Sequence, residues 1–333
     1  MRGLIVGVAV AAVGAAGCRP AELTLAVDPG FYPSAVAYDP GPDGYFVGSY
    51  ATGEVLVIGR DGSRGGTLRP SGASAPVVQL AYERKQRRLW TLTPRAVEVI
   101  DLEPAPARRT IVATAEAGGQ FGDLAVDGAG GAFVLDVARH EVLEIDAPRR
   151  SARVIARWPA AETSAPGPDA LAGPPCAGMP AAARGAGALM PLPDRSALIA
   201  AADGRWWRID RRSGDIEEVR LGSPLPEVSQ LVLLGSDYAS YHVAALRGLA
   251  NEVVTVHLGI DARRARVDAG TRIGFDTPLH GAFDGHRVVV LLGRLRHHPS
   301  WCGDGRPNLP PQLATYAITP TADGVSVAHA PAR

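Results

Sequence analysis

Short apolar bursts separated by turn residues follow one another along most of the chain. In the segment from Tyr32 to Gly62, bursts at 35–38, 45–49 and 54–58 are separated by stretches rich in Asp, Gly and Pro. Bursts of this length with Val and aromatic side chains, bounded by such turn formers, are typical of short antiparallel strands. The pattern therefore predicts a β-meander in this segment.

The same unit repeats along the sequence. Its copies carry an apolar residue at corresponding positions: Ala37, Leu80, Leu124, Leu189, Leu231 and Ala282. Most of these positions lie about 40 to 45 residues apart, a spacing typical of β-propeller blades, and loop insertions account for the two longer gaps. The repeat predicts an all-β protein: a single six-bladed β-propeller of four-stranded antiparallel blades over residues 23–320, followed by a C-terminal tail at 321–333. Residues 23–27 are expected to supply the strand that closes the ring.

The beginning of the chain has the pattern of an export signal. Met1 and Arg2 precede an apolar run that ends at Gly17, and this run is too short to span a bilayer. The run is followed by Cys18, and its end resembles the lipobox of bacterial lipoproteins. We therefore expect a signal peptide at 1–17, lipidation at Cys18 and a short tether at 18–22. The alternative is a plain secretory peptide with an incidental cysteine.

Lipidation would place the protein in the bacterial cell envelope. The residue after Cys18 is Arg19 rather than Asp, which favours the outer membrane, on its periplasmic or surface face. In an oxidising compartment Cys176 and Cys302, each in a Pro/Gly-rich stretch, are candidates for a disulfide. Two separate thiols are the alternative.

The charge of the chain excludes one class of partner. The sequence has 34 Lys and Arg against 34 Asp and Glu, a formal net charge of zero. Affinity for nucleic acid comes mainly from clustered cations that neutralise phosphates. We therefore expect no nucleic-acid partner.

Several blades are similar to a known family. The segments beginning at Pro33 (PSAVAYDPGPDGYFVGSYATGEVLVIGRDG), Phe121 (FGDLAVDGAGGAFVLDVARHEVLEID) and Phe275 (FDTPLHGAFDGHRVVVLLG) resemble blades of the regucalcin/gluconolactonase family of six-bladed propellers. The likeness covers most of the chain between Phe31 and Gly293. NHL-repeat propellers share these loose blade patterns.

The resemblance implies a metal site that this sequence does not keep. Lactone-hydrolysing members of the family hold a divalent metal with a Glu, two Asn and an Asp at the starts of inner strands. The corresponding positions here are Ser34, Gly122, Gly187 and Ser229. A cation such as Ca²⁺ needs six to eight oxygens, several of them anionic. We therefore predict that the metal site is lost and that the protein has no metal or other cofactor, with Ca²⁺ expected only if it is a hydrolase.

Other polar residues are expected at the mouth of the channel. The candidates lie at or near the starts of inner strands: Gln79, Asp123, Gln230, Asp276 and His280. An Asp and a His there could carry out acid–base chemistry or bind a polar ligand. The alternative is that these side chains bond to backbone groups in irregular turns.

Two other pairs of residues could bind a ligand or a metal, and each also has a simpler structural interpretation. Trp206 and Trp207 could form a platform for ligand stacking, but their place in a strand favours one ring in the core and one facing a neighbouring blade. His297 and His298 could contact a metal or haem, but a solvated loop is the simpler interpretation.

The sequence thus favours a membrane-anchored lipoprotein whose propeller is a non-catalytic module that binds a small ligand or another envelope protein. The alternative is a gluconolactonase-like hydrolase acting on a lactone or ester, with a site rebuilt around Asp123, Asp276 and His280.

Overall fold

The computed structural model describes residues 22–28, 30–72, 75–159, 187–248, 250–268, 271–272, 278–293, 311–321 and 324–329. Several residues singled out in the sequence lie outside these ranges: Cys18, Cys176, Asp276, His297, His298 and Cys302. Lipidation, the disulfide and any role of Asp276 therefore stay predictions. The described chain consists of short strands and one turn of 3-10 helix, η1 (Arg84–Gln86).

Three four-stranded antiparallel sheets follow one another in the first half of the chain. The first contains β2 (Pro33–Asp39), β3 (Gly44–Ser49), β4 (Val55–Ile58) and β5 (Arg64–Arg69). The second contains β6 (Gln79–Glu83), β7 (Arg88–Leu92), β8 (Ala96–Asp101) and β9 (Arg108–Thr114). The third contains β10 (Phe121–Val126), β11 (Gly131–Asp136), β12 (Glu141–Asp146) and β13 (Ser151–Arg157). Their strands pair in sequence order, which confirms the meanders that the apolar bursts predict.

The next sheet has nine strands and departs from the expected pattern of separate blades. One antiparallel half contains β14 (Gly187–Pro191), β15 (Ser196–Ala201), β16 (Trp206–Asp210) and β17 (Ile216–Leu221). The other half contains β18 (Gln230–Ser236), β19 (Ser240–Arg247), β20 (Glu252–Gly259) and β21 (Arg264–Val267), and β22 (Thr271–Arg272) also pairs with β20. The halves are joined because the outer strands β17 and β21 pair in parallel, with Arg220 opposite Arg264.

The last sheet joins the two ends of the described chain. It contains β1 (Glu22–Thr24), β23 (Pro278–Phe283), β24 (Arg287–Leu292), β25 (Gln312–Thr321) and β26 (Gly324–His329). β1 pairs antiparallel with β25, with Leu23 opposite Leu313, so a strand closes the ring where it was expected, although it spans Glu22–Thr24 rather than 23–27. β26 pairs with β25 inside the segment assigned to a C-terminal tail, so the sheet continues past residue 320.

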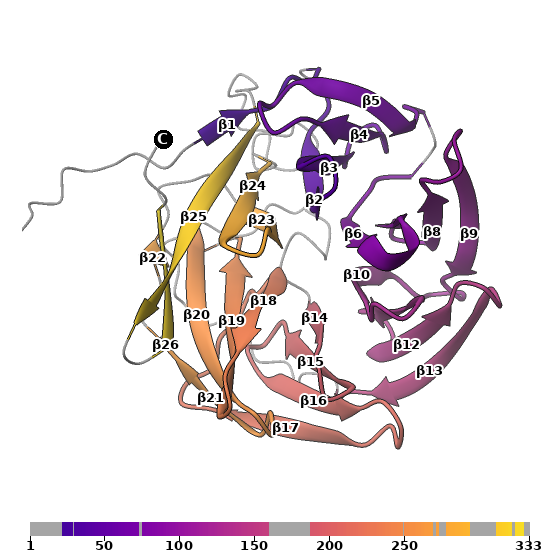
Figure 1. Ribbon diagram of the computed structural model, residues 1–333. Coiled ribbons are helices and arrows are strands. Elements are labelled where there is room, and N and C mark those ends of the chain that lie inside the picture. Colours follow the sequence, from indigo (N-terminus) through magenta and orange to yellow (C-terminus); the bar gives the residue numbers. More distant parts are fainter. Residues whose placement is uncertain are drawn as a thin grey trace, which may run out of the picture.

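The sheets stand around a central axis in the order of the sequence (Figure 1). The innermost strands β2, β6, β10, β14, β18 and β23 each contact the next, and β23 contacts β2. A single twisted sheet cannot bury both of its faces, so the apolar core lies in the spaces between neighbouring sheets. The result is an all-β, propeller-like fold.

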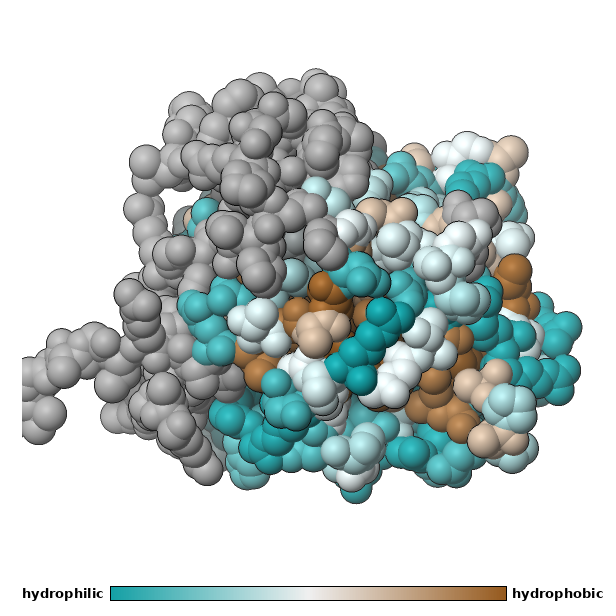
Figure 2. Space-filling model, turned by 90° about the horizontal axis from the view of Figure 1, so that it is seen from above, coloured by the Kyte–Doolittle hydropathy of each residue, from teal (hydrophilic) through white to brown (hydrophobic). Residues whose placement is uncertain are grey.

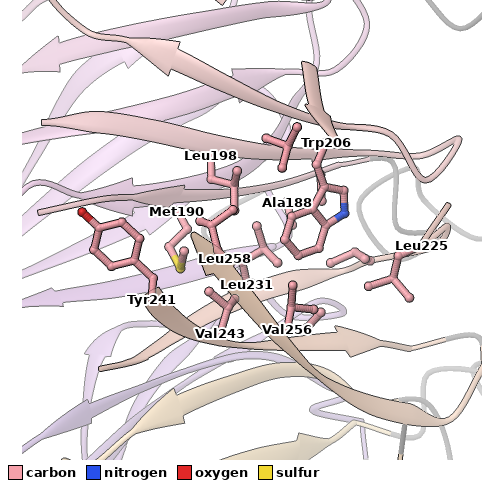
Figure 3. Close-up of a cluster of buried hydrophobic side chains, with 14 of the residues drawn as sticks. Ala188, Met190, Leu198, Trp206, Leu225, Leu231, Tyr241, Val243, Val256 and Leu258 are labelled. Atoms are coloured by element: carbon pink, nitrogen blue, oxygen red, sulfur yellow. The ribbon is translucent and has the colours of Figure 1, made fainter. Parts of the chain in front are cut away.

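The space between the two halves of the nine-stranded sheet shows how the core is built. Figure 3 shows Trp206 and Leu198 from one half meeting Val243, Val256 and Leu258 from the other. Trp206 is fully buried. Complete burial of a large apolar side chain contributes about 1.5 to 3 kcal/mol, so such clusters supply much of the stability of the ring.

The innermost strands correct the register of the repeat. Four leucines pack toward the preceding sheet: Leu80, Leu124, Leu189 and Leu231. Val36 also packs toward the preceding sheet, whereas Ala37 packs toward the following one. A side chain at Gly281 would meet Leu246 of the preceding sheet. The equivalent positions are therefore Val36 and Gly281, one residue before Ala37 and Ala282.

The described surface is mostly polar. On the coloured part of the side drawn in Figure 2, hydrophilic and intermediate residues surround separate apolar patches. The large apolar side chains that are exposed are Ile111, Val154, Tyr238 and Ile260.

Candidate functional site

The polar residues predicted at the channel mouth share one structural position. With the corrected register, Gln79, Asp123, Gln230 and His280 are equivalent residues of β6, β10, β18 and β23, each immediately before the residue that packs on the preceding sheet. Ala35 and Ala188 occupy this position in β2 and β14. The sequence therefore placed the four polar residues correctly on the inner strands, and the fifth candidate, Asp276, lies outside the described residues.

The four side chains do not all face the channel. A channel of about 250 Å³ runs along the axis, and Gln79 and Gln230 lie on its wall. Asp123 and His280 do not line it and are buried beside it, with 1% and 5% of their surface exposed. The structure does not show the expected convergence of Asp123 and His280 on the channel, because Asp123 bonds across to Leu189 of the next sheet and His280 is buried.

The wall of the channel is neutral. Besides the two glutamines, its described lining consists of apolar and aromatic residues of the six innermost strands, among them Tyr38, Tyr82 and Phe283. The innermost strand of each sheet also has an edge that pairs with no other strand. Such an edge presents backbone N–H and C=O groups that need hydrogen-bond partners.

Asp123 supplies such partners across three sheets. Its Oδ1 accepts hydrogen bonds from its neighbour's backbone N–H (Leu124, 2.7 Å) and from Gln79 Nε2 (2.7 Å). Its Oδ2 accepts the backbone N–H of Leu189 in the next sheet, also at 2.7 Å. One carboxylate thus joins β6, β10 and β14, and both of its oxygens are used in doing so.

The two glutamines also accept hydrogen bonds from backbone N–H groups of the inner strands, through their amide oxygens. Gln79 Oε1 accepts the backbone N–H of Leu80 at 2.9 Å, while its Nε2 donates to Asp123. Gln230 Oε1 accepts the backbone N–H of Gly281, which belongs to the next sheet. These contacts favour the alternative interpretation of the sequence, in which the polar side chains bond to backbone groups.

Burial moves the pKa values of the two titratable members in opposite directions. Removal from water raises the pKa of Asp123 to about 7, although the three donors around the carboxylate oppose this shift. Removal from water lowers the pKa of His280 to about 4, so its imidazole is neutral at physiological pH. The Nδ1 atom of His280 is buried and has no hydrogen-bond partner in the described part of the chain.

The four positions that correspond to the family metal site do not form one here. Ser34 and Ser229 are buried and donate to backbone carbonyls, Ser34 Oγ to Gly48 and Val77 and Ser229 Oγ to Leu246. A Cβ atom at Gly122 would come within 2.5 Å of the Val137 side chain, so this position has no room for an asparagine ligand. Together with Gly187, these positions offer no carboxylate, and they do not fit a calcium site.

Among the His, Cys, Asp and Glu side chains of the described ranges, no group of three or more is arranged to hold a metal ion. In the same ranges, no helix is long and apolar enough to cross a bilayer.

The tryptophan pair is structural. Trp206 packs between the two halves of the nine-stranded sheet, and Trp207 packs on the opposite face against the preceding sheet. Both rings are buried, so they form no platform for a ligand, and the expected division between two faces is confirmed.

Sequence reasoning missed one cluster of titratable residues. His242 and His257 lie opposite each other on β19 and β20, and their imidazoles bond to Asp237 and Asp268 respectively. A signal was present: the turn around Asn251 places Arg247 opposite Glu252, and counting outward from this pair brings the two histidines together.

Comparisons with known proteins identify the fold. No protein-family model matches the chain, and no curated protein sequence matches it. Calcium-binding regucalcin from Agrobacterium tumefaciens superposes with a TM-score of 0.57 at 12% identity, over 89% of this chain and 94% of that one. A streptogramin B lyase gives 0.55 at 9% identity, over 94% and 87%.

An inactive variant of virginiamycin B lyase from Staphylococcus aureus, in a structure with quinupristin, gives a TM-score of 0.56 at 12% identity over 92% of this chain and 87% of that one. Identities this low show the fold alone. They place the chain among the β-propeller proteins, in agreement with the four-stranded antiparallel sheets, and they assign it no activity.

Proposed function

We propose that this chain is a lipid-anchored protein of the bacterial cell envelope whose six-bladed β-propeller is a non-catalytic binding module. The blade count follows if β14–β17 and β18–β21 are two blades whose outer strands have paired. The closed ring of innermost strands, one from each antiparallel unit, supports this count.

The hydrogen bonding of Asp123 carries the non-catalytic part of the proposal. A general base must have a lone pair within reach of the substrate proton, and a general acid must present its own proton there. Both oxygens of Asp123 are instead held by donors from three sheets, and the side chain does not line the channel. The residue best placed by sequence for catalysis is thus used to fix the inner strands.

The channel supports binding of a small neutral molecule. Its wall is formed by residues of the six inner strands, among them Gln79, Gln230 and Tyr38, and the described lining includes no charged residue. Burial of a charged ligand in such a place would cost several kcal/mol without a partner. An envelope protein that docks on the loops around the channel is the other partner expected from the sequence.

The anchor is the second part of the proposal. A lipid chain contributes about 0.8 kcal/mol per buried CH₂, so a triacylated Cys18 would hold the protein durably on a membrane. The described chain begins at Glu22, only four residues after Cys18, and enters the outer side of the last sheet through β1. The body would therefore lie close to the bilayer.

The anchor is tested by mass spectrometry of the mature N-terminus and by membrane fractionation. We expect a lipidated Cys18 and loss of membrane association in Cys18→Ser. Release of an unmodified protein cut at another site would show a plain secretory peptide.

The rival function is a hydrolase for a lactone or ester. The shifted pKa values of Asp123 and His280 favour it, because such shifts also mark catalytic groups. Purified protein should be assayed with gluconolactone and p-nitrophenyl acetate, with and without Ca²⁺. We expect rates equal to buffer alone. Hydrolysis that requires Ca²⁺, or that disappears in Asp123→Asn, would establish the enzyme instead.

A further inference from the structure

Two histidines lie side by side on the face of β19 and β20 that is turned away from the cluster of Figure 3. His242 and His257 are directly opposite in the antiparallel register. Their ring centroids are 5.1 Å apart and their planes meet at 87°. The neighbouring residues on this face, Ala244, Leu246 and Val253, pack toward the last sheet. The pair therefore interrupts an apolar surface between two sheets.

Each ring is oriented by a carboxylate. His242 Nε2 lies 3.1 Å from Asp237 Oδ2, and His257 Nε2 lies 2.6 Å from Asp268 Oδ2. An ionised carboxylate can only accept a hydrogen bond, so Nε2 must carry the proton in both rings. In a neutral imidazole the remaining nitrogen, Nδ1, then has a free lone pair.

Nothing in the described chain uses the lone pair of His242. Its Nδ1 is buried and has no hydrogen-bond partner there, and only 8% of the residue is exposed. A buried nitrogen without a partner costs free energy, and such groups commonly mark a water or an ion that completes the site.

From these contacts we propose that His242 and His257 bind a divalent transition-metal ion, of which Zn²⁺ is the representative, through their Nδ1 atoms. Histidines that bind metals characteristically donate their other ring N–H to a carboxylate, which fixes the tautomer and the ring orientation. Asp237 and Asp268 take this supporting role. The site is separate from the channel and does not depend on the function proposed above.

The spacing of the rings fits this ion. Zinc binds imidazole nitrogen at about 2 Å with tetrahedral angles, which holds two ligating rings with their centroids about 5 Å apart. The observed separation is 5.1 Å. The ring spacing is therefore that of two imidazoles on one tetrahedral ion, whose remaining two ligands water must supply.

Charge and donor type select the class of ion. Asp237 and Asp268 bring two negative charges, and Arg266, whose Nε lies 3.4 Å from Asp268 Oδ1, offsets one of them. The remaining negative charge favours a cation. Imidazole nitrogen suits Zn²⁺, Ni²⁺ and Cu²⁺, whereas Ca²⁺ and Mg²⁺ prefer oxygen, so the site discriminates against the ions expected of a calcium-binding propeller.

The test is titration of untagged protein with Zn²⁺, followed by calorimetry and thermal unfolding. We expect one ion per chain at this site and a rise in melting temperature with Zn²⁺ or Ni²⁺, but not with Ca²⁺ or Mg²⁺. His242→Gln and His257→Gln should each weaken binding by about 100-fold or more. Asp237→Asn should weaken it by about 10- to 100-fold, the usual effect of removing a supporting carboxylate.

Matched controls keep the result specific. His286→Gln removes a histidine from the turn between β23 and β24 and should leave the affinity unchanged. A His297→Gln/His298→Gln double variant removes the two histidines that are adjacent in the sequence and should also have no effect. If His242→Gln does not fold, His257→Gln and the ¹⁵N shifts of the wild-type imidazoles with and without Zn²⁺ decide the matter.

Three outcomes would overturn the proposal. They are an unchanged melting temperature with Zn²⁺, an equal rise in both histidine variants, and ¹⁵N shifts showing that Nδ1 of neither ring binds the ion. Because lactone hydrolysis and membrane attachment are measured separately, failure here is distinguishable from failure of the proposed function.

Discussion

The hairpin of β19 and β20 has two faces that differ sharply in chemistry. On one face Tyr241, Val243 and Leu258 pack into the apolar cluster of Figure 3. On the other face His242 and His257 stand among apolar neighbours, each held by a carboxylate. The same two strands therefore present a surface that stabilises the ring and a surface that carries candidate chemistry.

The difference shows what alternation along a strand does and does not specify. Successive residues point to opposite faces, so Val243 and His242 are one residue apart in the sequence and on opposite sides of the sheet. An apolar residue at every second position is enough to place a strand in a propeller. The intervening positions are free to carry polar groups wherever a partner lies within reach.

Truncation in the apolar face should have the largest effect. Trp206→Ala removes a fully buried ring from the cluster between the two halves of the nine-stranded sheet. Because the surrounding strands can close such a cavity only in part, we expect a loss of about 3 to 5 kcal/mol in the free energy of unfolding. Urea denaturation followed by circular dichroism measures it.

Trp206→Phe is the matched control. It keeps most of the apolar ring and removes the indole N–H, which has no hydrogen-bond partner in the described part of the chain. We expect a loss of about 1 kcal/mol. Equal losses in both variants would mean that the cluster contributes less than its burial indicates.

The two buried titratable groups of the inner strands should give opposed pH dependences. The pKa of Asp123 is about 7 in the folded protein against 3.8 for a free side chain, so between about pH 4 and 7 the folded state keeps a proton that the unfolded state has lost. This contribution to stability is present at low pH and is lost as the pH rises to 7. The pKa of His280 is about 4 against 6.5, so its contribution is lost as the pH falls from 6.5 to 4.

Single variants should separate these contributions, each worth a few kcal/mol at most. Relative to wild type, Asp123→Asn should lose the part of the profile that falls with rising pH, and His280→Gln should lose the part that rises. Denaturation curves at pH 4, 5.5, 7 and 8.5 measure both. Profiles parallel to wild type in both variants would show that neither group titrates differently in the folded protein.

The sequence alone predicted the strands, the repeat and the closing strand at Leu23, because each depends on local alternation and turn residues. It misplaced Ala37 and Ala282 by one position, because β2 and β23 carry small residues on both faces there, so the size of the side chains does not mark which face packs on the preceding sheet. It also missed the pairing of β17 with β21, because that contact depends on the relative tilt of outer strands far apart in the chain.

The candidate site was less predictable than the fold. The sequence located four polar residues because they follow turns at strand starts: Gln79, Asp123, Gln230 and His280. It did not predict the direction in which their side chains point. Whether Asp123 enters the channel or bonds to Leu189 depends on a sheet that begins more than 60 residues later. The partners of His242 and His257 become visible only once the register of the hairpin is known.

A pair of adjacent substitutions tests the contrast between the two faces directly. Val243→Thr keeps the shape of the side chain but buries a hydroxyl in the apolar face, which should cost about 1 to 3 kcal/mol. His242→Leu, measured with a chelator present, should cost about 1 kcal/mol or less. Its partner Asp237 is nearly half exposed and still accepts the backbone N–H groups of Ala239 and Ser240 at 2.7 Å.

Which of these two substitutions costs more stability distinguishes a binding site from a structural network. If His242→Leu were the more damaging change in the absence of metal, the histidine face would be a structural network rather than a site awaiting a ligand. Chemical denaturation of both variants at pH 7.5 decides between these interpretations.

The smallest effect is expected at an apolar residue outside both faces. Ile111 lies on the outer strand β9 with 56% of its surface exposed. Because it loses little contact with water on folding, Ile111→Ala should change the free energy of unfolding by less than about 0.5 kcal/mol. A loss above 1 kcal/mol in the purified body would mean that Ile111 is covered, and comparing the melting temperature at low and high protein concentration would show whether a second copy covers it.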